Sequence, residues 1–213
     1  MADKLAFEQT IAVLGAVAEA MIESKDELTA LDAALGDGDL GRTVERGFRA
    51  ISEALQANDE TDLGKLLFKL GKVFGDAAAS SFGALFGTAL RKGGMALKGK
   101  TELTAADIAD GMQAALDALM ELGKAKIGDK TMLDAIYPAI QAIRASESTD
   151  VGACLRAAAD AAQGGAEQTK TMQSMIGRAS WQGERSIGQM DAGARAIALM
   201  LDAAAKKVMS DGS

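Results

Sequence analysis

The chain has 213 residues, 48% of them hydrophobic and only 4% aromatic, so it can bury a sizeable core and is not a disordered chain. Its formal net charge of −7 argues against nucleic-acid binding as its main activity. The absence of histidine excludes serine–histidine and cysteine–histidine nucleophile pairs and histidine-ligated zinc, and the single cysteine, Cys154, excludes an intramolecular disulfide.

Apolar residues recur at helical spacing along nearly the whole chain. The first predicted helix shows the pattern with Phe7, Ile11, Leu14, Ala18 and Met21 on one face. Abundant alanine and a single proline favour closely packed helices. In chain order, the predicted helices span residues 4–23, 41–57, 61–77, 81–96, 104–122, 130–145, 149–169 and 191–209, with a short helical piece at 27–34.

The connections between these helices are short, so consecutive helices should be antiparallel neighbours. At the start of the helix predicted at 104–122, Thr104 can cap the first turn and Asp107 favours it. We find no alternating strand pattern of useful length and no linker that divides the chain. The sequence therefore predicts a single all-α domain over residues 1–213.

The first residues of the chain and the length of its apolar runs indicate where in the cell the protein is expected. The first residues, MADKLAFEQT, lack the basic start and apolar run of a signal peptide, and no uninterrupted apolar run is long enough to cross a bilayer. A lone cysteine suits a reducing compartment. We expect a cytoplasmic protein with neither a membrane nor a nucleic acid as partner.

Residues 31–42, LDAALGDGDLGR, hold three aspartates, Asp32, Asp37 and Asp39. Like charges repel, so their spacing suggests a bound cation, and the glycines between them let the backbone turn until the carboxylates converge. A calcium EF-hand does not fit, because counting from Asp37 puts Phe48 where the bidentate glutamate belongs. Magnesium, bound by carboxylates and completed by phosphate oxygens, fits best.

A helix is predicted to begin directly after this loop, around Gly41 to Thr43. Its free amide groups and the positive end of its dipole would face an anion held at the loop, as in a site for a nucleotide polyphosphate. The alternative is that Asp37 and Asp39 only cap this helix in a solvated turn. The spacing by itself leaves both interpretations open.

The glycine-rich segment 177–193, GRASWQGERSIGQMDAG, is a second candidate functional loop. Arg178 could neutralise charge on a transferring phosphoryl group, or it could form a surface ion pair. Trp181 could be a lid or partner contact, or it could pack the loop onto the body of the protein.

Two further positions allow both a functional and a structural interpretation. Ser80 and Ser81 precede Gly83 at a predicted helix start, where backbone amides could bind a phosphate and a serine could equally be an N-cap. Lys130 could position the nucleotide loop or be an ordinary solvated lysine.

Three stretches, LDAALGDGDLGRTVERGF, GDKTMLDA and GRASWQGERSIGQMDAGA, resemble in order the signatures of the nucleotide-binding L subunit of dihydroxyacetone kinases. The resemblance covers nearly the whole chain from Leu31. It implies an eight-helix antiparallel up-and-down barrel and two Mg²⁺ ions that bind the phosphates of ADP or ATP. By correspondence, the metal ligands are Asp32, Asp37 and Asp39. Arg178 is the catalytic residue, and the nucleotide-binding residues are Leu40, Gly41, Thr43, Ser80, Ser81, Gly83, Gly123, Met132, Arg178, Asp191 and Gly193.

The chain departs from the family pattern at several of these signatures. Leu40 stands where the family usually has histidine, and Phe82 stands where it has serine. In GQMDAGA, where the family reads GHQDPGA, the substituted residues are Gln189, Met190 and Ala192. The metal ligands are retained, whereas the surroundings of the nucleotide are altered.

The resemblance also implies a function. The chain would pass a phosphoryl group from ATP, or from bound ADP recharged by a phosphocarrier protein, to a short ketose held on a separate K-type sugar-binding subunit. Because that subunit supplies the histidine that holds the sugar, the lack of histidine here is consistent with the family. Two alternatives are a non-catalytic, degenerate L-type module that binds nucleotide or a partner and regulates, and a structural helical bundle.

Overall fold

The computed structural model describes residues 2–211. Nearly all of the secondary structure in this range is helical. The helices are α1 Phe7–Glu23, α2 Lys25–Ala33, α3 Leu40–Gln56, α4 Leu63–Ala77, α5 Ser81–Ala96, α6 Ala105–Gly123, α7 Leu133–Ala145, α8 Val151–Gln168 and α9 Ala192–Asp211, with 3₁₀ segments η1 Thr169–Thr171 and η2 Arg178–Ser186 and strands β1 Leu5–Ala6 and β2 Glu102–Leu103.

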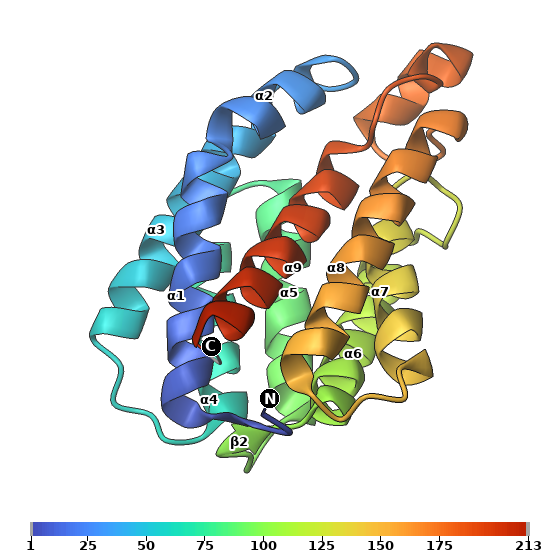
Figure 1. Ribbon diagram of the computed structural model, residues 1–213. Helices are drawn as coiled ribbons and strands as arrows, with labels where there is room; N and C mark the ends of the chain where they lie inside the picture. Colours follow the sequence, from blue (N-terminus) through green and yellow to red (C-terminus); the bar gives the residue numbers. More distant parts are fainter. Residues whose placement is uncertain (1, 212–213) are drawn as a thin grey trace.

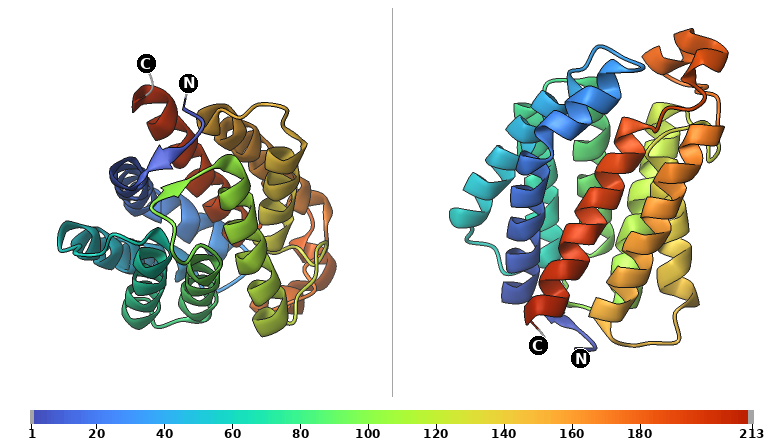
Figure 2. Two further views of the ribbon diagram at one scale, coloured as in Figure 1. Left: turned by 90° about the horizontal axis from the view of Figure 1, so that it is seen from below. Right: turned by 45° about the horizontal axis from the view of Figure 1, so that its top comes forward.

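Within residues 2–211, the eight helices other than α2 form a closed ring. Each packs against the next along the chain, from α1 and α3 round to α8 and α9, and α9 packs back against α1. The ring is seen end-on in the left view of Figure 2, and the short connections make neighbours antiparallel. The predicted all-α, eight-helix antiparallel barrel is therefore confirmed. Helix α2 packs on α3 at the upper end of the ring in Figure 1.

Most helix bounds lie within a few residues of the predicted ones, and two starts differ for physical reasons. The first helix begins at Phe7 because Leu5 and Ala6 pair antiparallel with Leu103 and Glu102. These two-residue strands are too short to produce an alternating pattern, so the sequence did not predict them. The helix expected from residue 130 begins at Leu133, because Lys130 has a left-handed φ of +64°, which an α-helix excludes.

Local sequence sets several of the helix starts. Thr104 and Asp107 form a complete capping box at the start of α6, with the Thr104 hydroxyl accepting from the Asp107 amide at 3.1 Å. The Asp62 and Asp150 side chains likewise accept from the third residues of α4 and α8. The cap predicted at Thr104 is therefore present.

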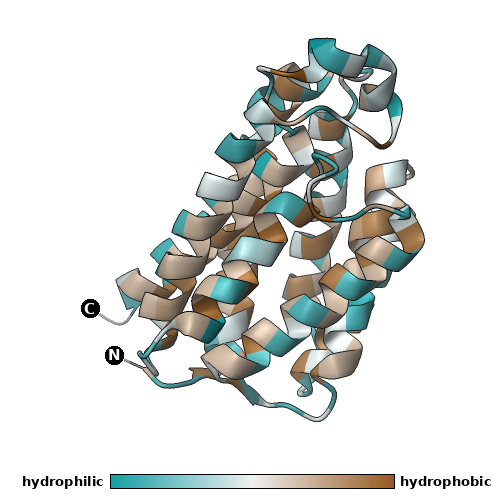
Figure 3. Ribbon diagram, turned by 90° about the vertical axis from the view of Figure 1, so that its right-hand side faces the viewer, coloured by the Kyte–Doolittle hydropathy of each residue, from teal (hydrophilic) through white to brown (hydrophobic). Residues whose placement is uncertain are grey.

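The core is built mainly of aliphatic and alanine side chains that face the inside of the ring. Hydrophobic and hydrophilic residues alternate along the helices in Figure 3, as expected for helices with one buried and one exposed face. Phe48, Phe74 and Phe86 pack ring to ring in this core, with centroids 4.8 to 5.8 Å apart. In the described range, no helix combines the length and the apolar character needed to cross a bilayer.

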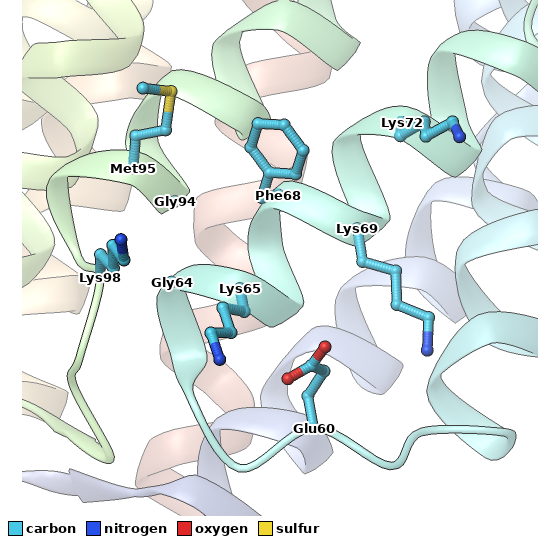
Figure 4. A pocket seen from close by; sticks show the side chains of 9 residues that line it. All are labelled: Glu60, Gly64, Lys65, Phe68, Lys69, Lys72, Gly94, Met95 and Lys98. Carbon is cyan, nitrogen blue, oxygen red and sulfur yellow. The ribbon is translucent and has the colours of Figure 1, made fainter.

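A groove of about 380 Å³ lies on the outside of α4 and α5 (Figure 4). Gly64 and Gly94 form part of its wall, Phe68 and Met95 expose apolar surface to it, and four lysines surround these two side chains. The lysines are Lys65, Lys69, Lys72 and Lys98. Residues of the predicted site do not line this groove.

Candidate functional site

The three aspartates lie at the upper end of the ring in Figure 1, at the junction of α2 and α3. Asp32 is in the last turn of α2, and the chain then turns through Gly38, whose φ of +70° favours glycine, before α3 begins at Leu40. One carboxylate oxygen from each aspartate lies within 4.8 Å of the other two. The convergence that the sequence predicted is therefore present.

The hydrogen bonds of the cluster test the alternative that Asp37 and Asp39 only cap α3. Asp39 precedes α3, but within residues 2–211 its side chain makes no capping hydrogen bond. The amide of Leu40 instead donates to Oδ2 of Asp32 at 3.1 Å, and Arg178 forms an ion pair with Asp37. Among residues 2–211, Arg178 is the one cation that forms an ion pair with the cluster, and it pairs with Asp37 alone. The three carboxylates therefore carry more negative charge than Arg178 neutralises.

The first turn of α3 is held closely against α2. A Cβ on Gly41 would lie 2.1 Å from the carbonyl oxygen of Lys25, so only glycine fits there. The Thr43 side chain is buried, and its hydroxyl has no hydrogen-bond partner in the described part of the chain. An unpaired buried hydroxyl is uncommon, and here it belongs to a residue that the sequence predicts to contact the nucleotide.

At the start of α5 the structure shows the capping role of serine. The Ser80 hydroxyl accepts from the Gly83 amide at 3.0 Å and is the N-cap, while Ser81 is exposed as the first helical residue. Gly83 has no room for a side chain, because a Cβ would lie 1.7 Å from the Ala78 carbonyl oxygen. Phe82 stacks on Phe86 with centroids 5.6 Å apart, so this departure from the family pattern packs against the core.

The other two predicted nucleotide contacts on this side flank the loop between α6 and α7. Gly123 is the last residue of α6, and a Cβ there would lie 3.5 Å from a methyl carbon of Leu85. Met132 is buried just before α7 and lies beside Gly193, where a Cβ would be 3.6 Å from that of Met132. Met132 and Gly193 are therefore neighbours, as a shared binding surface would require.

Asp191 stands at the start of α9. Its Oδ1 accepts from the Ala194 amide at 2.7 Å, and its own amide donates to the Thr169 hydroxyl at 2.9 Å. Burial raises the pKa of Asp191 to about 6, and the charges of Asp134 and Asp32 act in the same direction. Asp191 is therefore harder to ionise than an ordinary aspartate, chiefly because of its burial.

For Lys130, the structure contradicts one of the two interpretations from the sequence. The solvated lysine is wrong, because the Lys130 side chain is only 2% exposed. Its ammonium donates to the carbonyl oxygens of Met172 at 3.2 Å and Gln189 at 2.7 Å, and to that of Ser186. The neighbouring Asp134, which sequence reasoning did not select, is also buried and accepts from two amides of the same loop. The GDKTMLDA signature contains both residues, but their burial depends on tertiary contacts.

The segment Met172–Gln189 crosses the same end of the ring. It includes η2, whose helical conformation is interrupted at Gly183, and it brings Arg178 to Asp37. Trp181 is 80% exposed, so its packing onto the body of the protein, one of the two interpretations from sequence, is not observed.

The side chains at this end fit a magnesium-bound phosphate group. All three cluster ligands are carboxylate oxygens, the donors that Mg²⁺ prefers. The Thr43 hydroxyl, unpaired among residues 2–211, and the exposed Ser81 lie at the N-terminal ends of α3 and α5. Backbone amides at such ends favour anions. The structure therefore brings together the predicted metal ligands, Arg178 and the starts of two helices at one end of the ring.

Comparison with known proteins gives consistent matches. The DAK2 domain matches residues 34–206. The chain is 36% identical over 176 residues to the ADP-binding subunit DhaL of the PEP-dependent dihydroxyacetone kinase of Escherichia coli, which covers 82% of this chain and 84% of that protein. It is 38% identical over 188 residues to the D-erythrulose kinase of Mycolicibacterium smegmatis, covering 86% of this chain and 32% of that protein.

Longer relatives and a solved structure agree with these matches. The human triokinase/FMN cyclase is 39% identical over 194 residues, covering 90% of this chain and 33% of that protein, so the chain spans about a third of these longer kinases. The dihydroxyacetone kinase from C. freundii, solved in complex with AMP-PNP and Mg²⁺, superposes with a TM-score of 0.75 at 28% identity over 92% of this chain and 33% of that one. The chain therefore belongs to the DAK2 domain family, and the relatives named here are kinases or kinase subunits.

Proposed function

We propose that this chain is the nucleotide-binding subunit of a kinase for short ketoses such as dihydroxyacetone, acting in the cytoplasm. It binds ADP or ATP with two Mg²⁺ ions and passes a phosphoryl group to a sugar held on a separate K-type subunit. The phosphoryl source is ATP, or bound ADP recharged by a phosphocarrier protein. The observation that carries the proposal is the convergence of Asp32, Asp37 and Asp39 beside Arg178 in a chain of the DAK2 domain family.

The proposal assigns a role to each group of predicted site residues. Asp32, Asp37 and Asp39 hold the metal ions, which neutralise phosphate charge when bound. Arg178 adds a positive charge at the point where the cluster meets the phosphoryl group. The amides at the starts of α3 and α5 orient the phosphates. The remaining predicted contacts, Gly123, Met132, Asp191 and Gly193, would enclose the nucleotide at the same end of the ring.

A second candidate is a regulatory module that binds nucleotide without turnover. It is favoured by the two departures whose side chains pack inward, since Leu40 is only 6% exposed and Phe82 stacks on Phe86. Neither side chain can supply the polar group that the family has there. Turnover in the presence of a K-type subunit separates the two candidates.

Thermal and urea unfolding with Mg²⁺ and ADP, separately and together, tests the proposal. Ligand at about a hundredfold above its dissociation constant should stabilise the fold by ~2.7 kcal/mol. The Asp37→Ala variant should lose the part of this stabilisation that requires magnesium. The control variant Glu147→Ala, which removes an exposed carboxylate from the loop between α7 and α8, should retain it. Equal stabilisation of both variants would contradict the proposed site.

The catalytic part of the proposal has its own assay. With a K-type subunit loaded with dihydroxyacetone, the parent chain and a phosphoryl donor should produce the sugar phosphate. Nucleotide binding without any product would support the regulatory candidate instead.

A further inference from the structure

Lys130 lies outside the predicted site, yet it connects the two ends of the segment that carries Arg178. Its ammonium reaches the carbonyl oxygen of Met172 at the start of the segment and those of Ser186 and Gln189 at the end. The three hydrogens of an ammonium match three carbonyl acceptors. One side chain therefore fixes both ends of the stretch from Met172 to Gln189.

The backbone around Lys130 is held in place by its own loop. Lys130 has a φ of +64°, a left-handed conformation that is uncommon for a residue with a side chain. The buried carboxylate of Asp134 accepts from the amides of Gly128 and Thr131 on either side, and the Asp129 carbonyl accepts from the Met175 amide at 3.2 Å. The lysine is thus presented to the segment from a rigid turn.

Burial of a lysine is costly, which argues against a purely packing role. Desolvation lowers the pKa of the Lys130 ammonium, and the charge of Asp191 opposes this shift only in part. A buried charge needs strong hydrogen bonds to persist, and the carbonyl oxygens of the segment provide them. An apolar side chain of similar length would leave these carbonyl oxygens without their donor, so the ammonium itself is what ties them together.

Between these ends the segment has few attachments to the rest of the molecule. The ends themselves are also tied by the Ser174 amide, which donates to the Ser186 hydroxyl at 2.9 Å, and by the Gly188 amide, which donates to the Lys170 carbonyl oxygen at 2.7 Å. Trp181 is 80% exposed, and Arg178 meets Asp37 through an ion pair in which the Arg178 side chain is 60% exposed. An exposed ion pair contributes little by itself to holding a loop. The position of Arg178 thus depends on where the ends of the segment are anchored.

We propose that Lys130 is a positioning residue that clamps the segment Met172–Gln189 across the end of the ring and so holds Arg178 at the aspartate cluster. The proposal rests on the proposed function, because Arg178 acts there on the transferring phosphoryl group. Under this proposal Lys130 influences turnover only through the position of Arg178, and it does not set the positions of the three aspartates.

The first test needs no ligand. Trp181 is the only tryptophan of the chain and lies in the clamped segment, so its fluorescence anisotropy reports the mobility of the segment. Lys130→Met should lower this anisotropy, because the ends of the segment are released. Lys126→Met, which removes an exposed lysine of the same loop, should leave it unchanged. Unchanged anisotropy in Lys130→Met would overturn the clamp, whether or not the protein proves to be a kinase.

The second test measures turnover with the K-type subunit and dihydroxyacetone. Lys130→Met should lower kcat by about tenfold or more, because a misplaced charge no longer meets the phosphoryl group, while the affinity for Mg²⁺ and ADP changes by less than about threefold. Lys130→Arg, which keeps the charge, should recover part of kcat. A loss confined to nucleotide affinity would contradict the proposal.

A double variant separates positioning from a general structural effect. If Lys130 acts through Arg178, adding Lys130→Met to Arg178→Met should lower kcat no further than Arg178→Met alone. Additive losses would overturn the proposal. If Lys130→Met does not fold, as judged by circular dichroism, Lys130→Gln takes its place in every arm. Failure of the parent chain to bind Mg²⁺ and ADP would refute the proposed function, while the anisotropy arm still decides the clamp.

Discussion

Thr10 and Thr43 are both buried threonines in helices of the ring, and they differ in the state of the hydroxyl. Thr10 donates to the Ala6 carbonyl oxygen at 3.0 Å, whereas the Thr43 hydroxyl has no partner among residues 2–211. An unpaired buried hydroxyl destabilises a fold, and a paired one contributes a hydrogen bond. These two residues therefore form a matched pair for testing whether Thr43 is kept for a ligand.

We expect Thr43→Val to stabilise the ligand-free protein by about 1 kcal/mol, because an apolar group replaces the orphaned hydroxyl at similar volume. Thr10→Val should destabilise it by about 1 kcal/mol through loss of the hydrogen bond to Ala6. Urea unfolding without metal or nucleotide measures both changes. Destabilisation of similar size in the two variants would show that Thr43 has a partner in solution.

Asp191 makes stability depend on pH. Its pKa in the folded protein, about 6, lies above the usual value for aspartate, because burial disfavours the carboxylate. The folded state therefore holds this proton more tightly than the unfolded chain, so the stabilisation is complete at low pH and is lost as pH rises through about 6. Ionised Asp191 therefore destabilises the ligand-free fold at neutral pH, and the charge of Lys130 offsets this only in part.

Asp191→Asn should remove this dependence, because asparagine does not titrate and its side-chain oxygen can still accept from the Ala194 amide. Between about pH 5 and pH 7 the parent should lose about 1 kcal/mol relative to the variant. Urea unfolding at several pH values in the presence of a metal chelator provides the measurement. Parallel stability curves for the two proteins would count against the raised pKa.

At the scale of elements, helices α4 and α5 approach so closely that their backbones touch through glycines. A Cβ on Gly71 would lie 2.6 Å from the Gly87 carbonyl oxygen, whereas a Cβ on Gly75, one turn further along α4, would meet its nearest atom, the Gly83 carbonyl oxygen, at 3.8 Å. The first contact involves backbone, which cannot move aside as a flexible side chain can. The packing against α5 thus excludes a side chain at Gly71 but leaves room for one at Gly75.

Gly71→Ala should cost about 1 to 2 kcal/mol, since overpacking against α5 outweighs the better helix propensity of alanine. Gly75→Ala should instead add up to about 1 kcal/mol of stability, because the methyl group fits and alanine favours the helix. Denaturant unfolding of both variants tests the pair. Stabilisation by Gly71→Ala would mean that α4 and α5 separate easily.

For the whole molecule, the ring and the end that carries the site differ in how firmly they are held. Helix α8 is packed between α7 and α9 and has nine buried residues, whereas η2 has one, Ser186. Few buried contacts and exposed backbone hydrogen bonds permit local opening without unfolding of the core. The site therefore combines a rigid body with a movable segment.

Hydrogen exchange followed by mass spectrometry of the full chain should show this difference. Amides of Arg178–Ser186 should exchange at least about a hundredfold faster than those in the middle of α8, because the segment opens locally. Mg²⁺ with ADP should slow exchange in the segment more than in α8. Equal rates in the two regions before ligand is added would contradict this view.

The sequence by itself determined the helical class, the approximate bounds of the long helices and the three aspartates of the cluster. These follow from local properties: apolar residues repeat at helical spacing, Thr104 and Asp107 lie three residues apart as a capping box requires, and glycines next to Asp37 and Asp39 permit a sharp turn. Local signals of this kind are readable in a window of a few residues, without knowledge of the rest of the fold.

Only the tertiary structure decided which groups meet across the ring. The Arg178–Asp37 ion pair and the burial of Lys130 against three carbonyl oxygens depend on segments far apart in the chain. So does the burial of the Thr43 hydroxyl without a partner in the described part of the chain. Desolvation and hydrogen-bond partners are properties of the packed state, and one sequence window leaves a lysine free to be solvated or buried. The antiparallel order of the helices places the α2–α3, α6–α7 and α8–α9 connections at one end of the molecule, and the packing of α9 against α1 closes the ring.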